Sequence, residues 1–447
     1  RAPRRAGPPA GPALSDTADQ SGHRVTELDS GLRVATERMP AVRSIAVGMG
    51  VRVGSRDETA EQAGLSHFLE HLLFKGTDRF SSTEIDQIFD GMGADVNAGT
   101  GKETTTVYSR FLDQHLERAF DVMADMVLRP AYRDIDSERQ VVIEEIAMYE
   151  DEPSDKVHDV LARAIFGDHP LGRPIIGSAD VVGNVPIPDI AAYHDARYEP
   201  SRLVVAAAGN LDHDAVVALA EEKCGGGDGA RIASNGAAAR GPSPDAPRIC
   251  FHAKETEQYH LCLGGHGIRR SDERRFALRV LDTILGGSSS SRLFQEVREK
   301  RGLAYAVFSY SSLFTDSGQV ALYVGTRPDN LPEATEVIAG ELRRLRDDPV
   351  TVDELERAKE NVKGRTVLAM ESTIARMNRL GGALLTDVPL LTLDETLAAI
   401  DAVTLDDVTD IARELYDPER LSAAAVGADE DRFREAVGAV NPALAAA

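Results

Sequence analysis

The chain has 447 residues, of which 42% are hydrophobic and 28% charged. This composition allows more than one buried core and excludes a disordered protein. The formal net charge of −23 would repel phosphate backbones and anionic lipid, and no window has the long uncharged apolar run of a membrane span. We therefore expect neither nucleic acid nor a membrane as a partner.

The start of the chain and its cysteines bear on the cellular compartment. The opening RAPRRAGPPAGPALSD has no apolar stretch like that of a signal peptide, and its prolines oppose the amphipathic helix of an organellar targeting segment. We predict a disordered tail over residues 1–23. Three cysteines without CxxC spacing indicate neither a disulfide framework nor a thiolate zinc site: Cys224, Cys250 and Cys262. A cytoplasmic protein is expected, with an organellar matrix as the alternative.

Residues 24–223 are predicted to form a first half that contains strands and helices. The strand-like run RSIAVGMGVRVGS is followed by the helix-like segment AGLSHFLEHLLFKG, which Gly76 is expected to end. In this segment the apolar residues repeat at the spacing of one helical face: Leu65, Phe68, Leu69, Leu72 and Leu73. The segment is therefore predicted to be an amphipathic helix.

Two histidines and a glutamate stand out on this predicted helix. His67 and His71 are four residues apart, so their rings project from one face within reach of one zinc ion. Glu70 flanks that face, where a carboxylate can accept a proton from the water that the metal activates. The alternative is a solvated or buried histidine pair, but this pattern arises in such a chain with a chance of roughly a few percent. A zinc site is favoured, and it needs a third ligand.

The third ligand is expected from the helical segment ERQVVIEEIAMYEDEP, which Pro153 stops. At about 100° per residue, the residues that share the apolar stripe are Glu138, Val141, Val142, Glu145 and Tyr149. Glu144 lies on the polar stripe with Ser137, Gln140 and Asp151. A carboxylate on an apolar stripe is costly unless it is paired or binds a cation, so Glu145 is the predicted ligand.

Glu138 lies on the same stripe, one register earlier. There it is predicted to accept the other ring N–H of a ligating histidine. The alternative is an ordinary acidic residue at a helix N-terminus, where the macrodipole favours negative charge.

The composition changes near the middle of the chain. In CGGGDGARIASNGAAARGPSPDAPR, residues 224–248, the small residues and Pro displace the periodic apolar pattern, which predicts a flexible interdomain linker. Residues 249–447 then repeat the order of elements, with HLCLGGHGI, ERRFALRVLDTILGG and YAVFSYSS in place of RSIAVGMGVRVGS, the histidine helix and KETTTVYSRF. The predicted fold class is α+β, with two similar halves. The second helix has no histidine, so one zinc per chain is expected.

These motifs resemble those of the pitrilysin/insulinase family of zinc peptidases, and particularly its short-chain branch, which includes the mitochondrial processing peptidase β subunit and bacterial homologues. The resemblance is carried by GLSHFLEHLLFKGT, ERQVVIEE, HPLGRPIIG and SSRLFQEVREKRGLAYAVFSY. It implies two halves that enclose a cavity and a zinc-dependent endopeptidase acting on unfolded peptides or polypeptide segments. It covers most of the chain, apart from the tail and the linker.

The resemblance also implies where substrate binds. In VREKRGLAY it assigns Arg298 and Tyr305 to the substrate backbone, where the sequence alone indicates a helix-end cation and a strand residue. NAGTGKETTTVYSRF is similar to the family's edge strand, which binds substrate as an added strand and here includes Asn97 and Ala98. The alternative is an ordinary strand of the sheet.

A non-catalytic scaffold or peptide-binding subunit of the same fold is the alternative function. Relatives of that kind usually lose zinc ligands, and this chain has every one. Because the ligands and the Arg298–Tyr305 pair occur in one chain, we expect peptide substrates and a homodimer, with a heterodimer as the alternative.

Overall fold

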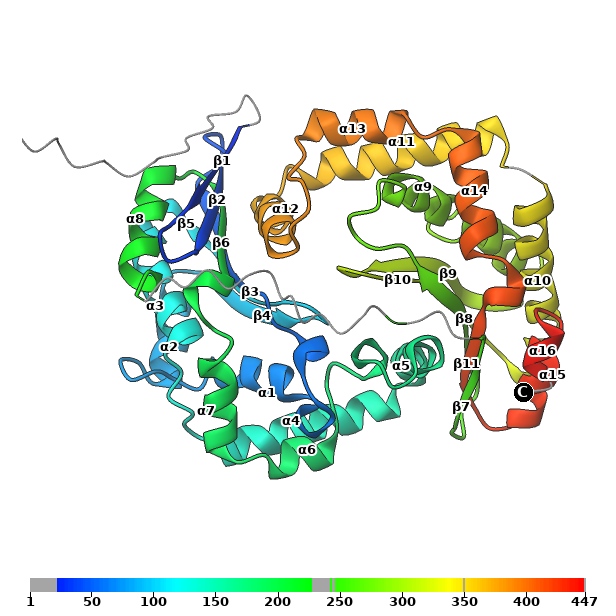
Figure 1. Ribbon diagram of the computed structural model, residues 1–447, viewed down its shortest axis with the longest axis horizontal. Coiled ribbons are helices and arrows are strands. Elements are labelled where there is room, and N and C mark those ends of the chain that lie inside the picture. Colours follow the sequence, from blue (N-terminus) through cyan, green and yellow to red (C-terminus); the bar gives the residue numbers. More distant parts are fainter. Residues whose placement is uncertain (1–21, 227–241, 243–245, 349, 446–447) are drawn as a thin grey trace, which may run out of the picture.

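The computed structural model describes residues 22–226, 242, 246–348 and 350–445. These residues form two halves, each with one sheet and its own helices, which confirms the predicted α+β class (Figure 1). The predicted tail, apart from its last two residues, and most of the predicted linker lie outside the described residues. Within the described ranges, no helix is long and apolar enough to cross a membrane.

The first half contains a six-stranded sheet in the order β1-β2-β6-β3-β5-β4. Its strands are β1 (His23–Glu27), β2 (Arg33–Arg38), β3 (Ser44–Val51), β4 (Asp95–Thr100), β5 (Thr105–Leu112) and β6 (Leu203–Gly209). Its helices are α1 (Leu65–Leu72), α2 (Ser82–Gly91), α3 (Leu116–Leu128), α4 (Ile135–Asp151), α5 (Pro153–Phe166), α6 (Ala179–Asn184), α7 (Ile187–Asp195) and α8 (His213–Cys224). The residue that begins the predicted linker, Cys224, therefore ends a helix.

The second half contains a five-stranded sheet in the order β7-β11-β8-β10-β9. Its strands are β7 (Ile249–Ala253), β8 (Tyr259–Gly267), β9 (Ala304–Leu313), β10 (Gly318–Thr326) and β11 (Ser422–Gly427). Its helices are α9 (Arg275–Leu285), α10 (Leu331–Asp347), α11 (Val352–Ala369), α12 (Thr373–Leu385), α13 (Leu393–Asp401), α14 (Leu405–Leu415), α15 (Glu430–Val437) and α16 (Pro442–Ala445).

The two sheets place equivalent strands in the same order, so β3 corresponds to β8, β5 to β10 and β4 to β9. The predicted match of KETTTVYSRF with YAVFSYSS is therefore wrong by one strand. The first run lies in β5, which is paired on both sides, whereas the second lies in the edge strand β9. Strand propensity does not distinguish an edge strand from its inner neighbour, and this is why the sequence misplaced the match.

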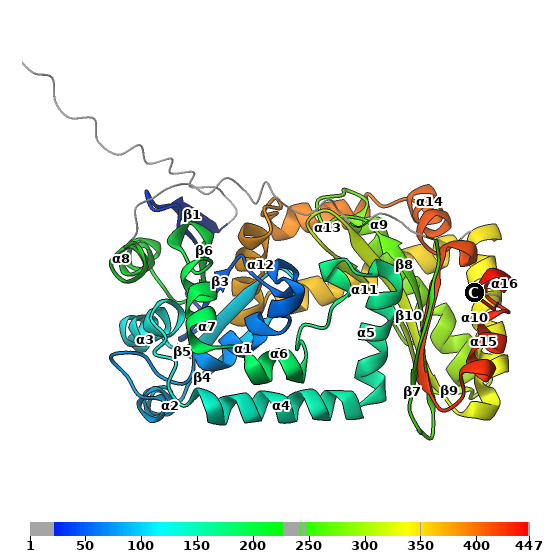
Figure 2. The same ribbon diagram turned by 60° about the horizontal axis from the view of Figure 1, so that its bottom comes forward.

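Each half contributes a helix to the sheet of the other half. Helix α5 packs on the second sheet, where Val157 and Leu161 join a core cluster with Tyr323. Helix α12 packs on the first sheet, and it comes so close that a Cβ at Gly48 would lie 2.4 Å from Sδ of Met377. In Figure 2, α4 runs along the base and α5 turns from it toward the second sheet. Helices α5 and α12 therefore each pack on the sheet that lies on the other side of the predicted boundary at residue 223. The sequence could not predict this, because periodicity shows that a helix face is buried but not which sheet covers it.

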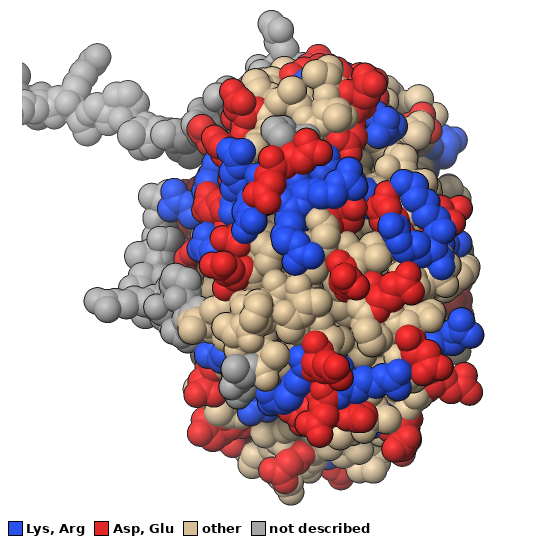
Figure 3. Space-filling model, turned by 90° about the vertical axis from the view of Figure 1, so that its right-hand side faces the viewer, with Lys and Arg blue, Asp and Glu red and all other residues tan. Residues whose placement is uncertain are grey.

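Charges of both signs mix on the outer face of the second half. Figure 3 shows Lys and Arg beside Asp and Glu across this face. Ion pairs of opposite charges occur on helix α15, where Arg432 lies 3.0 Å from Asp329 and Arg434 lies 2.8 Å from Glu430. On this face, therefore, the acidic residues do not form a continuous negative patch.

Candidate metal centre

Helix α1 carries the two histidines and is held in place by its buried apolar face. All five apolar residues of the predicted stripe are buried. At the helix start, the carboxylate of Glu58 accepts hydrogen bonds from the backbone amides of Gly64 at 2.9 Å and Ser66 at 2.7 Å. The helix ends at Leu72, four residues before Gly76, because its last turn tightens as the amide of Phe74 bonds to the carbonyl of His71. Packing and this carboxylate cap fix the direction in which the histidine side chains project.

The structure brings His67, His71 and Glu145 together. The Glu145 carboxylate oxygens lie 3.7 Å from Nε2 of His67 and 3.3 Å from Nε2 of His71. In the part of the chain that the structure describes, these three residues are the one group of His, Cys, Asp or Glu side chains placed to share an ion. Ligand atoms around tetrahedral zinc lie roughly 3.4 Å apart, so the spacing fits. Two imidazoles and a carboxylate form a donor set of catalytic zinc sites, which keep a fourth position open.

Helix α4 carries Glu145 at the edge of its buried face. Its buried residues are Ile135, Glu138, Val142 and Ile146. Val141, expected on the interior stripe, is instead 51% exposed, because the buried stripe runs through Val142 and Ile146 and leaves Val141 to one side. Glu145 is half-buried and faces the histidines, whereas Glu144 is exposed. The structure thus turns Glu145 toward the histidines and leaves Glu144 exposed.

Glu138 contacts His71 on the side of the ring that faces away from Glu145. Its Oε1 lies 2.9 Å from Nδ1 of His71, and Lys75 contacts its other oxygen at 2.6 Å. When Nδ1 donates this hydrogen bond, Nε2 of His71 keeps the lone pair that a metal needs. No motif or spacing in the chain selects Lys75, which is one cation in the turn after the helix.

His67 is also in a state suited to metal binding. Burial, and then the neighbouring His71, lower the pKa of His67 to about 4. The imidazole is therefore neutral near pH 7, and the neutral ring is the form that binds a metal.

Glu70 lies beside the three ligand residues and is held by Thr100, which donates a hydrogen bond to its Oε2. Burial raises the pKa of Glu70, and the hydrogen bond from Thr100 offsets part of that rise. Both residues line a cavity of about 320 Å³ together with His67, Glu145 and Tyr149. A raised pKa makes the carboxylate a stronger base. Sequence reasoning missed Thr100, although it follows Asn97 and Ala98 by only a few residues.

Asn97 and Ala98 lie in β4, which is the edge strand of the first sheet. The expectation of an edge strand here is met, but the free edge belongs to β4 and not to the Thr-rich run of β5. The backbone amide of Ala98 donates to the side chain of Asn97 at 2.8 Å, so an added strand would have to replace this contact. Because β4 ends at Thr100, its edge leads directly to Glu70.

Arg298 and Tyr305 lie together in the second half. The Arg298 guanidinium is 4.5 Å from the centroid of the Tyr305 ring, and Tyr305, on the edge strand β9, is 79% exposed. Among the described residues, no hydrogen bond, ion pair or ring contact joins this pair to the three ligand residues. The structure therefore brings the pair together, but not to the metal centre.

A second cavity, of about 390 Å³, adjoins the first and is lined by both halves. Asp159 and Ile175 line both cavities. The second cavity also has Lys102 of the first half and Phe308 of the second half in its wall. A chain that reaches the metal centre through this cavity would contact both halves.

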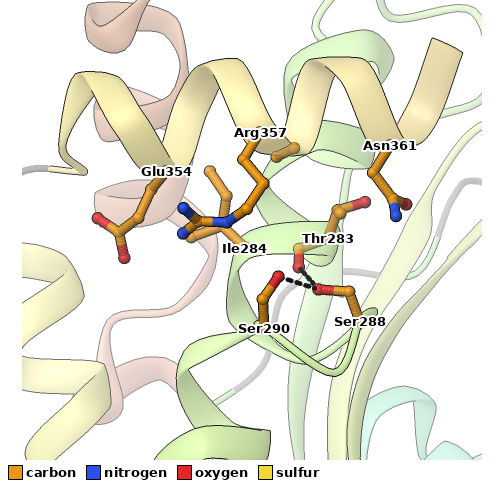
Figure 4. Close-up of a pocket in the computed structure, with 8 residues that line it drawn as sticks. Thr283, Ile284, Ser288, Ser290, Glu354, Arg357 and Asn361 are labelled. Atoms are coloured by element: carbon orange, nitrogen blue, oxygen red, sulfur yellow. Dashed lines mark hydrogen bonds between the residues drawn. The ribbon is translucent and has the colours of Figure 1, made fainter. Parts of the chain in front are cut away.

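The matching helix of the second half, α9, carries no histidine. Helix α9 carries the half-buried Asp282, which accepts hydrogen bonds from Ser311 at 2.6 Å and from Tyr416 at 2.9 Å. Next to it, a pocket of about 10 Å³ is lined by Thr283, Ser288, Ser290 and neighbours, and Figure 4 shows Ser288 in contact with Ser290 and with the backbone carbonyl of Thr283. A volume of this size holds about one water molecule.

Comparison with protein families agrees with these features. Residues 33–179 match the model described as "Insulinase (Peptidase family M16)", and residues 184–362 match "Peptidase M16 inactive domain". The second match begins near the end of the first half and extends into the second half, which lacks the zinc motif.

Similar proteins and structures extend the match over most of the chain. An uncharacterized zinc protease of Streptomyces coelicolor is 44% identical over 92% of this chain and 90% of its own length. An uncharacterized zinc protease of Bacillus subtilis is 42% identical over 87% of this chain and 94% of its own. The crystal structure of a protease from Helicobacter pylori is similar in fold, with a TM-score of 0.83 and 23% identity over 91% of this chain and 99% of that one.

Proposed function

Because the chain belongs to the insulinase family, peptidase family M16, we propose that it is a zinc-dependent endopeptidase that cuts unfolded peptides or polypeptide segments. The observation that carries this proposal is the placement of His67, His71 and Glu145 around one point, with Glu70 beside them at a cavity. One zinc per chain follows from the single group of this kind in the described residues.

Each side chain of the site has its own role in the proposed hydrolysis. When bound, zinc would polarise the scissile carbonyl and make water more acidic. Thr100 holds the Glu70 carboxylate in place, and Glu70 takes a proton from the hydrolytic water and later returns it to the leaving amine. Glu138 keeps the His71 ring turned toward the centre. The edge of β4 pairs with the extended peptide and brings its backbone to Glu70.

Zinc quantification and a peptide-library digest on the purified chain test the proposal together. We expect about one zinc per chain and cleavage that a chelator abolishes. Zinc binding without cleavage of any peptide would favour the alternative, a peptide-binding or scaffold subunit of the same fold. The inverted motif with every ligand present is the observation against that alternative.

Replacing Arg298 with Gln or Tyr305 with Ala is expected to lower kcat/KM without releasing zinc. The two side chains contact each other and lie away from the ligands, so we propose that they orient the peptide backbone as the halves approach. Cleavage kinetics and zinc content of each variant provide the measurement. As a matched control, Arg327→Gln removes another arginine of the second half. Unchanged kinetics in both variants would leave the pair a structural contact.

Substrates are expected to be selected first by their ability to enter as an extended chain. A peptide that pairs with β4 must pass the cavity shared by both halves, so a stably folded protein carrying the same cleavage sequence should resist. Peptides with Lys or Arg near the cut should also be preferred, because part of the acidic excess would line the path, and high salt should weaken this preference.

Matched basic and acidic peptides at low and high salt, beside the folded protein, give the measurement. Equal rates for the two peptides would place the acidic excess on the outer surface only. Efficient cutting of the folded protein at a site that stays structured would contradict the enclosure.

A further inference from the structure

Four charged side chains join the two halves at the turn that follows β4. Arg56 and Glu103 belong to the first half, Arg270 and Asp316 to the second, and we call these four residues the bridging cluster. Glu103 lies 2.7 Å from Arg56 and 2.9 Å from Arg270, while Arg56 also contacts Asp316. The Glu103 side chain is only 11% exposed, so these contacts are shielded from solvent more than surface pairs are.

Both carboxylate oxygens of Glu103 accept hydrogen bonds, and these bonds hold the side chain in one position. Besides the two guanidinium groups, its carboxylate accepts the backbone amide of Thr315 at 3.0 Å. Thr315 and Asp316 lie in the turn between β9 and β10 of the second half. Arg270 is itself tied to the same turn through the carbonyls of Leu313 and Phe314, since its side chain and its amide donate to them. The turn after β4 is thus docked on the turn after β9.

The docked turn is connected to the metal centre by two short paths. Thr100, three residues before Glu103, donates to Glu70. The turn also binds the segment that carries Arg56, because the amides of Ser55 and Arg56 donate to the carbonyls of Gly101 and Lys102 at 3.1 and 2.8 Å. That segment continues to Glu58, which caps the start of helix α1. The positions of Glu70 and of helix α1 therefore both depend on the position of this turn.

We propose that Glu103 is a positioning residue, which holds the turn after β4 against the second half and thereby fixes Thr100 and Glu70 for hydrolysis. This inference rests on the proposed peptidase function. It makes the catalytic arrangement dependent on contact between the halves: when the halves separate, Glu103 loses Arg270 and Thr315, and the turn that carries Thr100 loses its support. Bound substrate that draws the halves together would then complete the site that cuts it.

Two variants and a matched control test this role. Glu103→Gln and Arg270→Gln each remove charge from the bridging cluster, whereas Lys254→Gln removes a different contact between the halves, the pair with Asp151. Amide hydrogen exchange over residues 99–106, with and without zinc, should become about 10-fold faster or more in the first two variants and stay unchanged in the control. Their kcat should fall by about 10- to 100-fold with little change in KM, with zinc content and Tm retained. Arg270→Lys, which keeps the charge, should recover most of the lost kcat.

The outcomes separate this inference from the proposed function. Wild-type exchange over residues 99–106 in both variants would overturn the inference, as would an effect of equal size in Lys254→Gln. Wild-type protein that holds zinc but cuts no peptide would overturn the proposed function, and the exchange data would still show whether the bridging cluster orders the turn.

Discussion

Replacing Glu70 with Gln is expected to leave the fold and the zinc content unchanged while lowering kcat for peptide hydrolysis by about 10²- to 10⁴-fold. Glu70 is not one of the three residues placed around the metal position, so its loss removes the base and not a ligand. Glutamine has nearly the same shape and can still accept the hydrogen bond from Thr100. It cannot take a proton from water, and the metal cannot replace that role.

The measurement is single-turnover cleavage of a fluorogenic peptide, with zinc determined by mass spectrometry on the same sample. Glu61→Gln is the matched control, because Glu61 is an exposed glutamate shortly before the same helix and is expected to be dispensable. Turnover of the Glu70 variant within about threefold of wild type would mean that the base lies elsewhere, and Glu138 would be the candidate to replace next.

The local features of the metal centre could be predicted from the sequence because they depend on positions within single helices. The four-residue spacing of His67 and His71 puts both rings on one face in any α-helix. The choice of Glu145 over Glu144 follows from a rotation of about 100° per residue. Local geometry of this kind is fixed by helical periodicity, and in the structure all three side chains lie around one point.

Other features depend on contacts between distant segments, and the sequence did not reveal them. Thr100 reaches Glu70 because β4 ends beside helix α1, which no spacing in the chain encodes. The same holds for the exchange of α5 and α12 between the halves and for Glu103, whose partners in the second half lie more than 160 residues away. Prediction was also limited within a single helix, as the exposed Val141 shows. Helical periodicity predicts which direction a side chain takes, but not how wide a face the neighbouring elements cover.

Replacing Glu145 with Gln is expected to release zinc, whereas Glu144→Gln should bind it as wild type does. The amide removes a negatively charged oxygen ligand that lies 3.3 Å from Nε2 of His71. The loss of affinity should exceed the about 10- to 100-fold weakening expected for Glu138→Gln, which removes only the partner of a ligand.

The three glutamate variants of helix α4 therefore form a graded series, measured as zinc retained against increasing chelator. Each variant makes the same chemical change, so differences among them report position alone. Glu144 is the stringent control, because it neighbours Glu145 in the chain but is exposed and is not one of the residues placed to share an ion. Zinc that survives Glu145→Gln but is released by Glu144→Gln would mean that α4 is rotated by one residue from its place in the structure. In that case the packing of Val142 and Ile146 against the interior would also have to be reassigned.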